Sequence, residues 1–575
     1  MQRRAIAALI LAVAAVAACG GVLAGGAGAT SPGKARQYLV LAERNATGAA
    51  VRTAVVRSGG RIVGANRRIG LFTVVSRNPG FARVATATRA IRSAGRSRPI
   101  GSSRPVDRDR LDRISRHRSV GEATRGEDGH RRRRRDPEPL ADLQWDMRMI
   151  NATREGSYGE QRGRRKVLVG IIDTGIDGAH PDIAPNFDAE LSRNFTVDIP
   201  AIDGPCATDP DKSCTDPANV DEDGHGTHVA GTIGAAINGL GIAGVAPGVT
   251  LVNLRAGQDS GYFFLKPTLD ALTYAADNGI DVVNMSFATD PWLYNCRNNP
   301  GDSPAERVEQ ALIIDATQRA VDYARSRGLT LVSALGNEAV DLGNPLVDPF
   351  SPDFPVGSER TRTIDNSCLN VPTETDGVIS VSSLGPSGAK SDFSNYGVEQ
   401  TDVSAPGGFA TDFPGTPQFN RVENTVLSAY PESVGRANGD IAPDGTPTAD
   451  SVVRDCQAGV CAYYRYEEGT SMAAPHAAGV AALIVSEFGS RRHDDGITMD
   501  PAEVERILED TASHVPCPSP PLVDYTPNGS PGVTALCEGT PRFNGFYGNG
   551  VVDALAAVGD DDDHDGDRGE HGGDH

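Results

Sequence analysis

The chain has nine cysteines, and no two of them stand at the CxxC spacing used by zinc sites and redox-active dithiols. This absence argues against a cysteine-based metal or redox site. The N-terminus lacks an apolar run of membrane-spanning length, because the run at residues 5–18 is too short. That run follows Arg3 and Arg4, and a charged segment before an apolar one is typical of an export signal.

Two cleavage sites fit this signal. The small residues Ala27-Gly28-Ala29 predict ordinary cleavage, which would make residues 1–29 a signal peptide and release the protein. The alternative is Val16-Ala17-Ala18-Cys19, which resembles a lipoprotein box and would leave a lipid anchor on Cys19. The paired arginines lack the fuller sequence of a twin-arginine signal. We therefore expect a secreted protein, with a lipid-anchored protein as the alternative.

Eight cysteines lie beyond the signal, and an even set in an exported protein predicts disulfide bonds. Eight cysteines allow 105 connectivities. A preference for short loops favours sequential pairs. The expected bonds are Cys206 with Cys214, Cys296 with Cys368, Cys456 with Cys461, and Cys517 with Cys537.

Charge separates the front of the chain from the rest. Residues 1–135 hold 28 Lys+Arg and 7 Asp+Glu, whereas the whole chain holds 55 and 75, so residues 136–575 are strongly acidic. An Arg-rich front is compatible with nucleic-acid binding. A basic segment that faces an acidic partner in the same exported chain explains it without nucleic acid, and we expect no nucleic-acid partner.

Composition divides the rest of the chain into four segments. Residues 30–100 contain strand-like apolar runs at 38–41 and 71–75, which predict a small α+β domain. Residues 101–135 lack apolar periodicity and end in five arginines, which predicts an exposed linker with a processing site. The large body spans residues 136–559, with a Pro- and Gly-rich surface insertion at about 409–468. Residues 560–575 form an acidic tail that is expected to be disordered.

Within the body, short β-branched runs alternate with stretches that fit helices. Residues 167–172 form a continuous apolar run, typical of a strand buried on both faces. This alternation predicts an α/β fold, a doubly wound and mostly parallel sheet with helices on both faces. Further strands are expected at 250–252, 280–284, 329–332 and 378–381, and helices at 269–278 and 308–327.

Three short motifs carry residues of catalytic type. Asp173 follows the first buried run in Asp-Thr-Gly, His225 opens Gly-Thr-His-Val-Ala-Gly after Gly224, and Ser471 lies in Gly-Thr-Ser-Met-Ala-Ala-Pro-His. Strand ends and the helix starts after them share one rim of a parallel sheet, where open α/β folds place their sites. His225 and His228 alone could be a zinc pair, but no third ligand is near in sequence.

In the order Asp, His, Ser, these motifs resemble those of the subtilisin family, the subtilases. The resemblance covers roughly residues 140–558 and implies a subtilisin-like fold and a serine-type endopeptidase that acts on polypeptides. A serine hydroxyl is a weak nucleophile at neutral pH, so Ser471 needs a base, and the imidazole of His225 has a suitable pKa. Asp173 would orient that imidazole and stabilise its charged form. The chemistry requires no cofactor.

The resemblance also implies an oxyanion hole and a substrate cleft. Asn337 matches the subtilase asparagine that donates to the oxyanion, beside the backbone N–H of Ser471. Substrate would lie extended between residues 258–262 and 286–288. The pocket preference stays open, because the chain departs from the family pattern at Phe287 and Ala288 and is longer after Asn337. The expected substrate-binding residues are Gly261, Ser286, Phe287, Ala288, Ala334, Gly336 and Gly469.

Residues 30–100 resemble the inhibitory prodomains of subtilases. This implies a zymogen whose own prodomain helps the acidic body to fold and then blocks the cleft. Subtilases commonly bind calcium, and the acidic stretches 203–211 and 221–223 suit its preference for oxygen ligands, although no twelve-residue calcium loop occurs and the ligands stay unknown. Nothing requires more than a monomer. The alternatives are a dedicated leader-peptide or proprotein processing protease and a non-catalytic peptide-binding lipoprotein.

Overall fold

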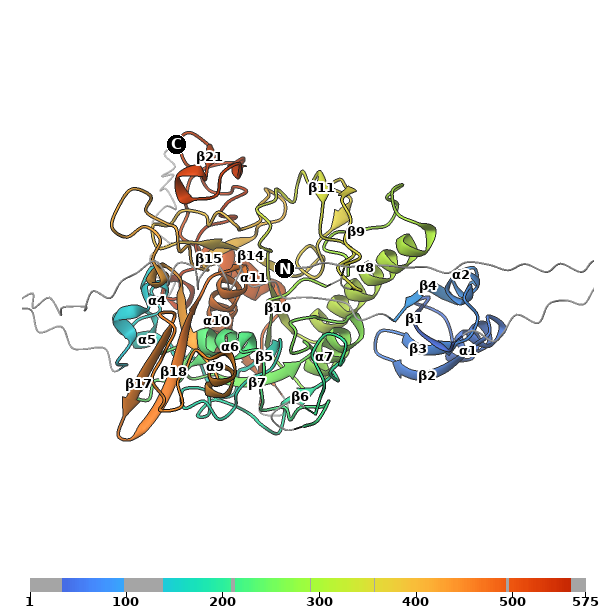
Figure 1. Cartoon of the computed structure of the whole chain (residues 1–575), viewed down its shortest axis with the longest axis horizontal. Helices are drawn as coiled ribbons and strands as arrows, with labels where there is room; N and C mark the ends of the chain where they lie inside the picture. Colours follow the sequence, from blue (N-terminus) through green and yellow to red (C-terminus); the bar gives the residue numbers. More distant parts are fainter. Residues whose placement is uncertain are drawn as a thin grey trace, which may run out of the picture.

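The computed structural model describes residues 34–97, 138–207, 212–289, 291–355, 357–492 and 496–559. The predicted signal peptide with Cys19, the linker at 101–135 and the tail at 560–575 lie outside the described residues. A small unit at residues 34–97 lies beside a much larger body (Figure 1). We call these two parts the front unit and the body.

The front unit is a four-stranded antiparallel sheet with two helices, the α+β arrangement expected from the sequence. Its strand order is β2-β3-β1-β4. Val40, Val55 and Phe81 are among the residues of its own apolar core. The elements are β1 (Arg36–Ala42), α1 (Gly48–Arg57), β2 (Gly60–Asn66), β3 (Leu71–Ser76), α2 (Phe81–Thr86) and β4 (Ile91–Arg96).

The front unit packs on two helices of the body, α7 (Leu265–Asp277) and α8 (Pro304–Arg325). Leu41 and Leu71 of the sheet belong to the same apolar cluster as Leu312 of α8. Around this cluster, arginines of the front unit pair with aspartates of the helices. The basic front of the chain therefore faces an acidic surface of the same chain. The ion pairs are Arg44–Asp322 at 2.6 Å, Arg68–Asp277 at 2.9 Å and Arg92–Asp315 at 3.0 Å.

The body is built on a seven-stranded sheet in which all paired strands run parallel. Neighbouring residues of one strand face opposite sides, since Leu251 and Val252 belong to different apolar clusters. Both faces of the sheet are thus buried, as a doubly wound fold requires. In sheet order the strands are β15 (Val403–Pro406), β14 (Ile379–Leu384), β10 (Thr330–Ala334), β8 (Val282–Met285), β5 (Leu168–Ile172), β7 (Thr250–Arg255) and β6 (Arg193–Asn194).

Helices cover both faces of this sheet (Figure 1). α6 (His225–Gly234) and α10 (Thr470–Phe488) pack together on one face, with α11 (Pro501–Asp510) against α10, while α7 and α8 cover the other. Because α10 is rich in Ala, α6 and several strands approach it closely, and nearly all of it is buried. Of the described helices, α10 is the one with the length and apolar composition to cross a membrane, and 89% of that stretch is buried inside the molecule.

The prediction that residues 409–468 form a surface insertion is wrong for two strands of this segment, which are buried. This segment forms an antiparallel sheet, β16-β18-β17, together with α9 (Glu432–Asn438). β16 (Val426–Ala429) is buried against α6, and the inner half of β18 (Val460–Glu467) is buried as well, whereas β17 (Val452–Gln457) is largely exposed. Most of the segment consists of residues typical of loops, and the two buried strands in it are short. Composition alone therefore predicts that the whole segment lies on the surface.

The four disulfides join the pairs that the sequence predicts, Cys206–Cys214, Cys296–Cys368, Cys456–Cys461 and Cys517–Cys537. Cys296–Cys368 links β9 (Asn295–Cys296) to β13 (Cys368–Leu369), and Cys456–Cys461 closes the β17–β18 hairpin.

The remaining elements are η1 (Ala141–Leu143), α4 (Trp145–Met149), α5 (Ser157–Glu160), β11 (Val347–Asp348), β12 (Arg362–Thr363), η2 (Val422–Asn424), β19 (Ser490–Arg491), β20 (Ile497–Thr498), β21 (Leu522–Asp524), η3 (Thr526–Asn528), β22 (Thr534–Leu536) and η4 (Ala556–Val558).

Candidate active site

Asp173 and His225 form the centre of the candidate site. Asp173 directly follows β5, and His225 is the first residue of α6, so both lie at the carboxyl end of the sheet. His225 Nδ1 lies 2.8 Å from Asp173 Oδ1, and both side chains are buried. This contact fixes the ring with its proton on Nδ1. Nε2 has no hydrogen-bond partner among the described residues and is available to exchange a proton with a neighbouring group.

The pKa of His225 is raised to about 9. Burial acts against this and lowers the pKa, but the Asp173 carboxylate raises it more, through its charge and its hydrogen bond. The charges of Glu467 and Asp223 add to the increase. The site therefore stabilises the imidazolium, which is the form that a general base reaches after it has taken a proton.

Asp221 holds the two halves of this pair together. Its Oδ1 accepts hydrogen bonds from Thr174 Oγ1 (3.1 Å) and Gly224 N (2.9 Å), and its Oδ2 accepts from the amide and hydroxyl of Thr227. The carboxylate thus joins the turn after β5 to the first turn of α6. The sequence suggested residues 221–223 as a calcium-binding stretch, but the lone pairs of Asp221 are used by the chain itself, so this residue does not fit a calcium ligand.

Ser471 lies in the first turn of α10, the helix that packs along α6. Its Oγ donates a hydrogen bond to the carbonyl of Ser286 at 3.2 Å. Among the described contacts, no hydrogen bond joins Ser471 to His225. Catalytic hydrogen bonds are often loose without substrate and tighten when it binds, so this geometry is compatible with a nucleophile.

Asn337 lies close to the start of α10. Its Oδ1 accepts hydrogen bonds from the amide and the hydroxyl of Thr470, both at 2.9 Å, and this fixes which way the side-chain amide points. A Cβ atom built on Gly469 would lie 3.5 Å from Asn337 Nδ2 and 3.6 Å from Ser471 N. Two N–H donors thus flank one small space, and a side chain at position 469 would fill it. Thr470 lies in the same motif as Ser471, but the sequence does not reveal its contact with Asn337.

A pocket opens beside Ser471 and Asn337, which both contribute to its lining. Five of the expected substrate-binding residues also line it: Ser286, Phe287, Ala288, Ala334 and Gly336. Gly469 adjoins the pocket through the space between the two N–H donors. Gly261 is not among the lining residues and lies in a turn in which its N–H donates to the carbonyl of Gln258.

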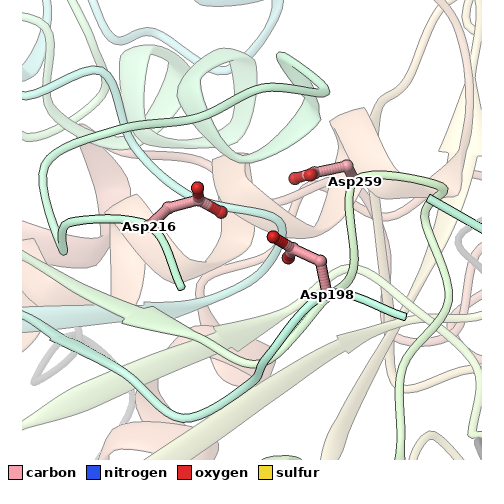
Figure 2. Close-up of side chains that lie close together, drawn as sticks. All are labelled: Asp198, Asp216 and Asp259. Atoms are coloured by element: carbon pink, nitrogen blue, oxygen red, sulfur yellow. The ribbon is translucent and has the colours of Figure 1, made fainter. Parts of the chain in front are cut away.

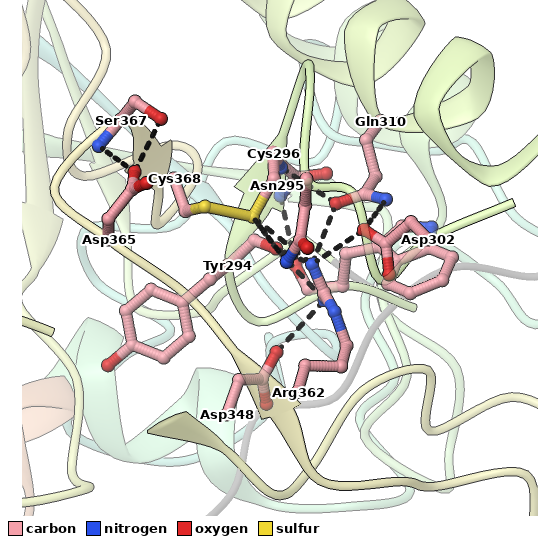
Figure 3. The surroundings of a disulfide bond; sticks show 12 residues. Tyr294, Asn295, Cys296, Asp302, Gln310, Asp348, Arg362, Asp365, Ser367 and Cys368 are labelled. Atoms are coloured by element: carbon pink, nitrogen blue, oxygen red, sulfur yellow. Dashed lines mark hydrogen bonds and ion pairs between the residues drawn. A yellow bond between two sulfur atoms is a disulfide. The ribbon is translucent and has the colours of Figure 1, made fainter. Parts of the chain in front are cut away.

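Other parts of the pocket wall come from segments that the sequence did not single out. Glu338 follows Asn337, while Asp353 and Asn370 come from the long connection between β10 and β14. The Cys296–Cys368 disulfide fastens this connection to the segment after β8 (Figure 3). Arg362 lies beside the disulfide and pairs with Asp302 at 3.1 Å and Asp348 at 3.0 Å. No short motif marks these residues. They lie in a connection that is longer than the family pattern after Asn337, so comparison with the family motifs does not reach them.

His228 does not share a metal site with His225. Its Nε2 lies 3.1 Å from the carbonyl oxygen of Val426 and 3.0 Å from that of Arg465. The ring therefore anchors α6 to β16 and β18, while Nδ1 of His225 binds Asp173.

Three carboxylates outside the site converge in a buried cluster. Asp198, Asp216 and Asp259 point toward one another (Figure 2), and one carboxylate oxygen from each lies within 4.8 Å of the other two. The guanidinium of Arg255 forms ion pairs with all three, including one of 2.6 Å with Asp259. Since a cationic side chain already lies among these oxygens, the cluster does not fit a calcium ion.

Comparisons with known proteins agree with this geometry. The model of the subtilase family, Peptidase_S8, matches residues 164–550, which include Asp173, His225 and Ser471. Over 368 residues, the chain is 29% identical to the nisin leader peptide-processing serine protease NisP of Lactococcus lactis subsp. lactis, covering 64% of this chain and 46% of that protein. It is 27% identical to subtilisin DY of Bacillus licheniformis over 349 residues, covering 61% and 84%.

Solved structures show the same fold. The epidermin leader peptide processing serine protease EpiP of Staphylococcus aureus matches with a TM-score of 0.57 and 21% identity, covering 91% of this chain and 99% of that one. The subtilisin-like fold expected from the motifs is therefore confirmed.

Proposed function

The chain belongs to the subtilase family of serine proteases, and we propose that it is a secreted endopeptidase made as a self-inhibited precursor. Ser471 is the proposed nucleophile, His225 the general base and Asp173 the residue that orients the base. The observation that carries this proposal is the buried 2.8 Å contact between His225 Nδ1 and Asp173 Oδ1 at the rim of the sheet.

The proposed reaction has two steps. Ser471 Oγ attacks the peptide carbonyl as its proton passes to His225 Nε2, and the imidazolium then returns that proton to the leaving amine, which gives an acyl-enzyme. A water molecule attacks the ester in the same way and releases the acid and Ser471. During both attacks, the oxyanion would accept hydrogen bonds from Asn337 Nδ2 and Ser471 N, the two donors that flank one space.

The front unit supports the self-inhibited precursor. It packs on α7 and α8 through an apolar cluster bordered by ion pairs, so it can stay bound after the linker is cut. Four disulfides support maturation in an oxidising compartment. Structural calcium stays part of the proposal without assigned ligands, and we propose a monomer with no nucleic-acid partner.

A dedicated processing protease is the second candidate. Support comes from NisP, which processes a leader peptide, although this chain spans only 46% of its length. A processing protease would cut one sequence and leave casein intact, whereas a general endopeptidase would digest both. If the enzyme is selective, its proposed substrate is the Arg-rich linker of its own precursor.

The test is the intact mass of the secreted protein from the wild-type gene and from Ser471→Ala. We expect that only the wild type is cut between the front unit and the body, since loss of a triad serine lowers turnover by about a million-fold. A matched control is Ser490→Ala, an exposed serine in β19, which should process like the wild type. Equal trimming of wild type and Ser471→Ala would show that another protease cuts the chain and would contradict self-processing.

A further inference from the structure

The start of α10, which carries Ser471, depends on contacts from side chains. Pro475 lies inside this helix and has no N–H, so it cannot donate to the carbonyl of Ser471 four residues before it. The hydroxyl of Ser286 donates to that carbonyl instead, at 2.9 Å. Groups other than the backbone of α10 therefore help to fix the position of the proposed nucleophile.

His476 supplies a second contact of this kind. Its Nδ1 lies 2.8 Å from the carbonyl oxygen of Met472, the residue that follows Ser471, and the imidazole ring is buried. A carbonyl oxygen can only accept a hydrogen bond, so Nδ1 carries a proton and donates it. The ring is thus bound to the first turn of α10 with one nitrogen, and the other nitrogen stays available for a different partner.

That partner is the carboxylate of Asp146. His476 Nε2 lies 3.1 Å from Asp146 Oδ2, and both side chains are 0% exposed. The other carboxylate oxygen, Oδ1, is buried as well and has no hydrogen-bond partner among the described residues. A buried carboxylate is costly unless another group compensates its charge, and here the imidazole does so.

Asp146 comes from α4, at the start of the body, and this element has a fixed place in the fold. Trp145 Nε1 donates a hydrogen bond of 3.0 Å to the carbonyl of Thr425. On the other side of Asp146 in the sequence, Met147 belongs to the same apolar cluster as Ala477 of α10. The fold therefore holds the carboxylate of Asp146 beside α10, and the contact with His476 is one part of a larger packed interface.

As a refinement that rests on the proposed function, we propose that Asp146 and His476 are positioning residues for the nucleophile. Asp146 holds the imidazole of His476 in place, and this ring holds the carbonyl of Met472. Ser471 is the next residue along the backbone, so its position is fixed by the same contacts. Neither member of the pair lines the pocket beside Ser471, so the pair acts on the nucleophile and not on the binding of substrate.

The proposal makes the start of the body a part of the active-site framework. α4 follows the linker at residues 101–135 in the sequence, and its packing brings Asp146 to α10. A body whose first residues have not packed would leave His476 without its carboxylate. Correct packing of the segment that follows the linker is thus a condition for full activity.

The first variant, Asp146→Leu/His476→Phe, removes the pair without leaving a buried charge. Apolar side chains in place of a buried ion pair often leave stability unchanged or raise it, so this variant should fold. Active sites are counted by labelling with a fluorophosphonate to completion, and kcat for a peptide substrate is expressed per labelled site. We expect kcat to fall by roughly 10- to 100-fold and KM to stay within about 3-fold, since a small displacement of a reacting group is costly. A wild-type kcat per site would overturn the inference.

Two single variants test the role of Asp146 independently of the double variant. In Asp146→Asn the side-chain amide can donate to His476 Nε2 while Nδ1 still donates to Met472, so kcat per site should stay within about 3-fold of the wild type. Asp146→Ala removes the support of the ring and should lower kcat per site by roughly 10-fold. Equal values for the two variants would contradict the assignment.

Two controls separate positioning from general damage. Asp142→Ala makes the same change at an exposed aspartate of η1 and should match the wild type. Tyr464→Phe removes a buried hydrogen bond of 2.6 Å to Asp182, in a different apolar cluster, and should lower the free energy of unfolding but leave kcat per site unchanged. A loss of kcat per site in Tyr464→Phe as large as in Asp146→Ala would attribute the effect to stability and refute the inference.

The same label makes the failure of this inference distinct from failure of the proposed function. A fluorophosphonate that labels the wild type but not Ser471→Ala reports an active nucleophile whatever the pair contributes. Labelled enzyme whose kcat per site does not respond to loss of the pair would refute the positioning role alone. A wild type that is neither labelled nor able to cleave any peptide would refute the proposed function.

Discussion

The raised pKa of His225 predicts that activity increases with pH up to that pKa. In the proposed mechanism only the neutral imidazole of His225 takes the proton of Ser471, so a pKa of about 9 predicts that most of the free enzyme is in the inactive form at neutral pH. We expect kcat/KM to rise about tenfold for each pH unit below that pKa and to level off above it. A pH profile of kcat/KM with an uncharged substrate measures the midpoint.

The charge of Asp223 offers a control on this interpretation. Asp223 is one of the carboxylates that raise the pKa of His225, so Asp223→Asn should move the midpoint to lower pH. Glu359→Gln removes a carboxylate that is exposed in the connection between β10 and β14, and should leave the midpoint in place. A wild-type midpoint at or below about 6.5, the ordinary value for histidine, would contradict the stabilised imidazolium.

At the residue scale, the sequence identified the pair that makes contact, Asp173 and His225, because each lies in a short motif of unusual composition. It did not identify Asp221 as the residue that holds them, since its five acceptor contacts depend on how the turn folds. Asp353 could not be predicted as a pocket residue for another reason. It enters the pocket from a connection whose length departs from the family pattern, and no local signal marks it.

At the element scale, the disulfides are expected to contribute unequally to stability. Cys296–Cys368 spans 72 residues and Cys456–Cys461 spans 5. In the chain-entropy account, closing the longer loop stabilises the fold by about 4 kcal/mol and closing the shorter one by about 2 kcal/mol. Denaturant unfolding of Cys296→Ser/Cys368→Ser and of Cys456→Ser/Cys461→Ser, each in the Ser471→Ala background, measures both losses.

Position in the fold strengthens this ranking. Cys296–Cys368 fastens the wall that carries Asp353 and Asn370, whereas Cys456–Cys461 closes an exposed hairpin. In the active enzyme, loss of the first bond should therefore also raise KM, and loss of the second should not. Equal stability losses, or a KM effect for the hairpin pair alone, would show that loop length and wall position do not govern the result.

The elements themselves followed from apolar patterning where packing is regular. The five expected strands correspond to β5, β7, β8, β10 and β14, and the expected helices to α7 and α8. Patterning failed for the segment at 409–468, because β16 and the inner half of β18 are short and separated by polar loops. Burial there depends on α6 lying against β16, a long-range contact that local composition cannot show.

At the scale of the whole molecule, the division of charge predicted that the basic front faces the acidic body. Three ion pairs across this contact have exposed arginines, with side chains that are 65%, 55% and 50% accessible. Exposed pairs contribute about 0–1 kcal/mol each, and salt screens them. The apolar cluster with Leu41, Leu71 and Leu312 is not screened, so it should supply most of the affinity between the two parts.

The processed protein should therefore keep its front unit in salt of about 1 M, although it should bind it roughly 10- to 100-fold less tightly than at low salt. Replacing all three arginines, Arg44, Arg68 and Arg92, by Gln should weaken the association by roughly 10- to 100-fold at low salt and remove most of its salt dependence.

The matched control replaces Arg77, Arg83 and Arg89 by Gln. These are three exposed arginines with no described ion pair to the body, so the control changes the net charge equally. Gel filtration of processed protein, followed by quantification of the co-eluting front unit, measures the association. If both triple variants weaken it equally, overall charge rather than these three contacts holds the front unit; if high salt alone releases it, the apolar cluster is not the main source of affinity.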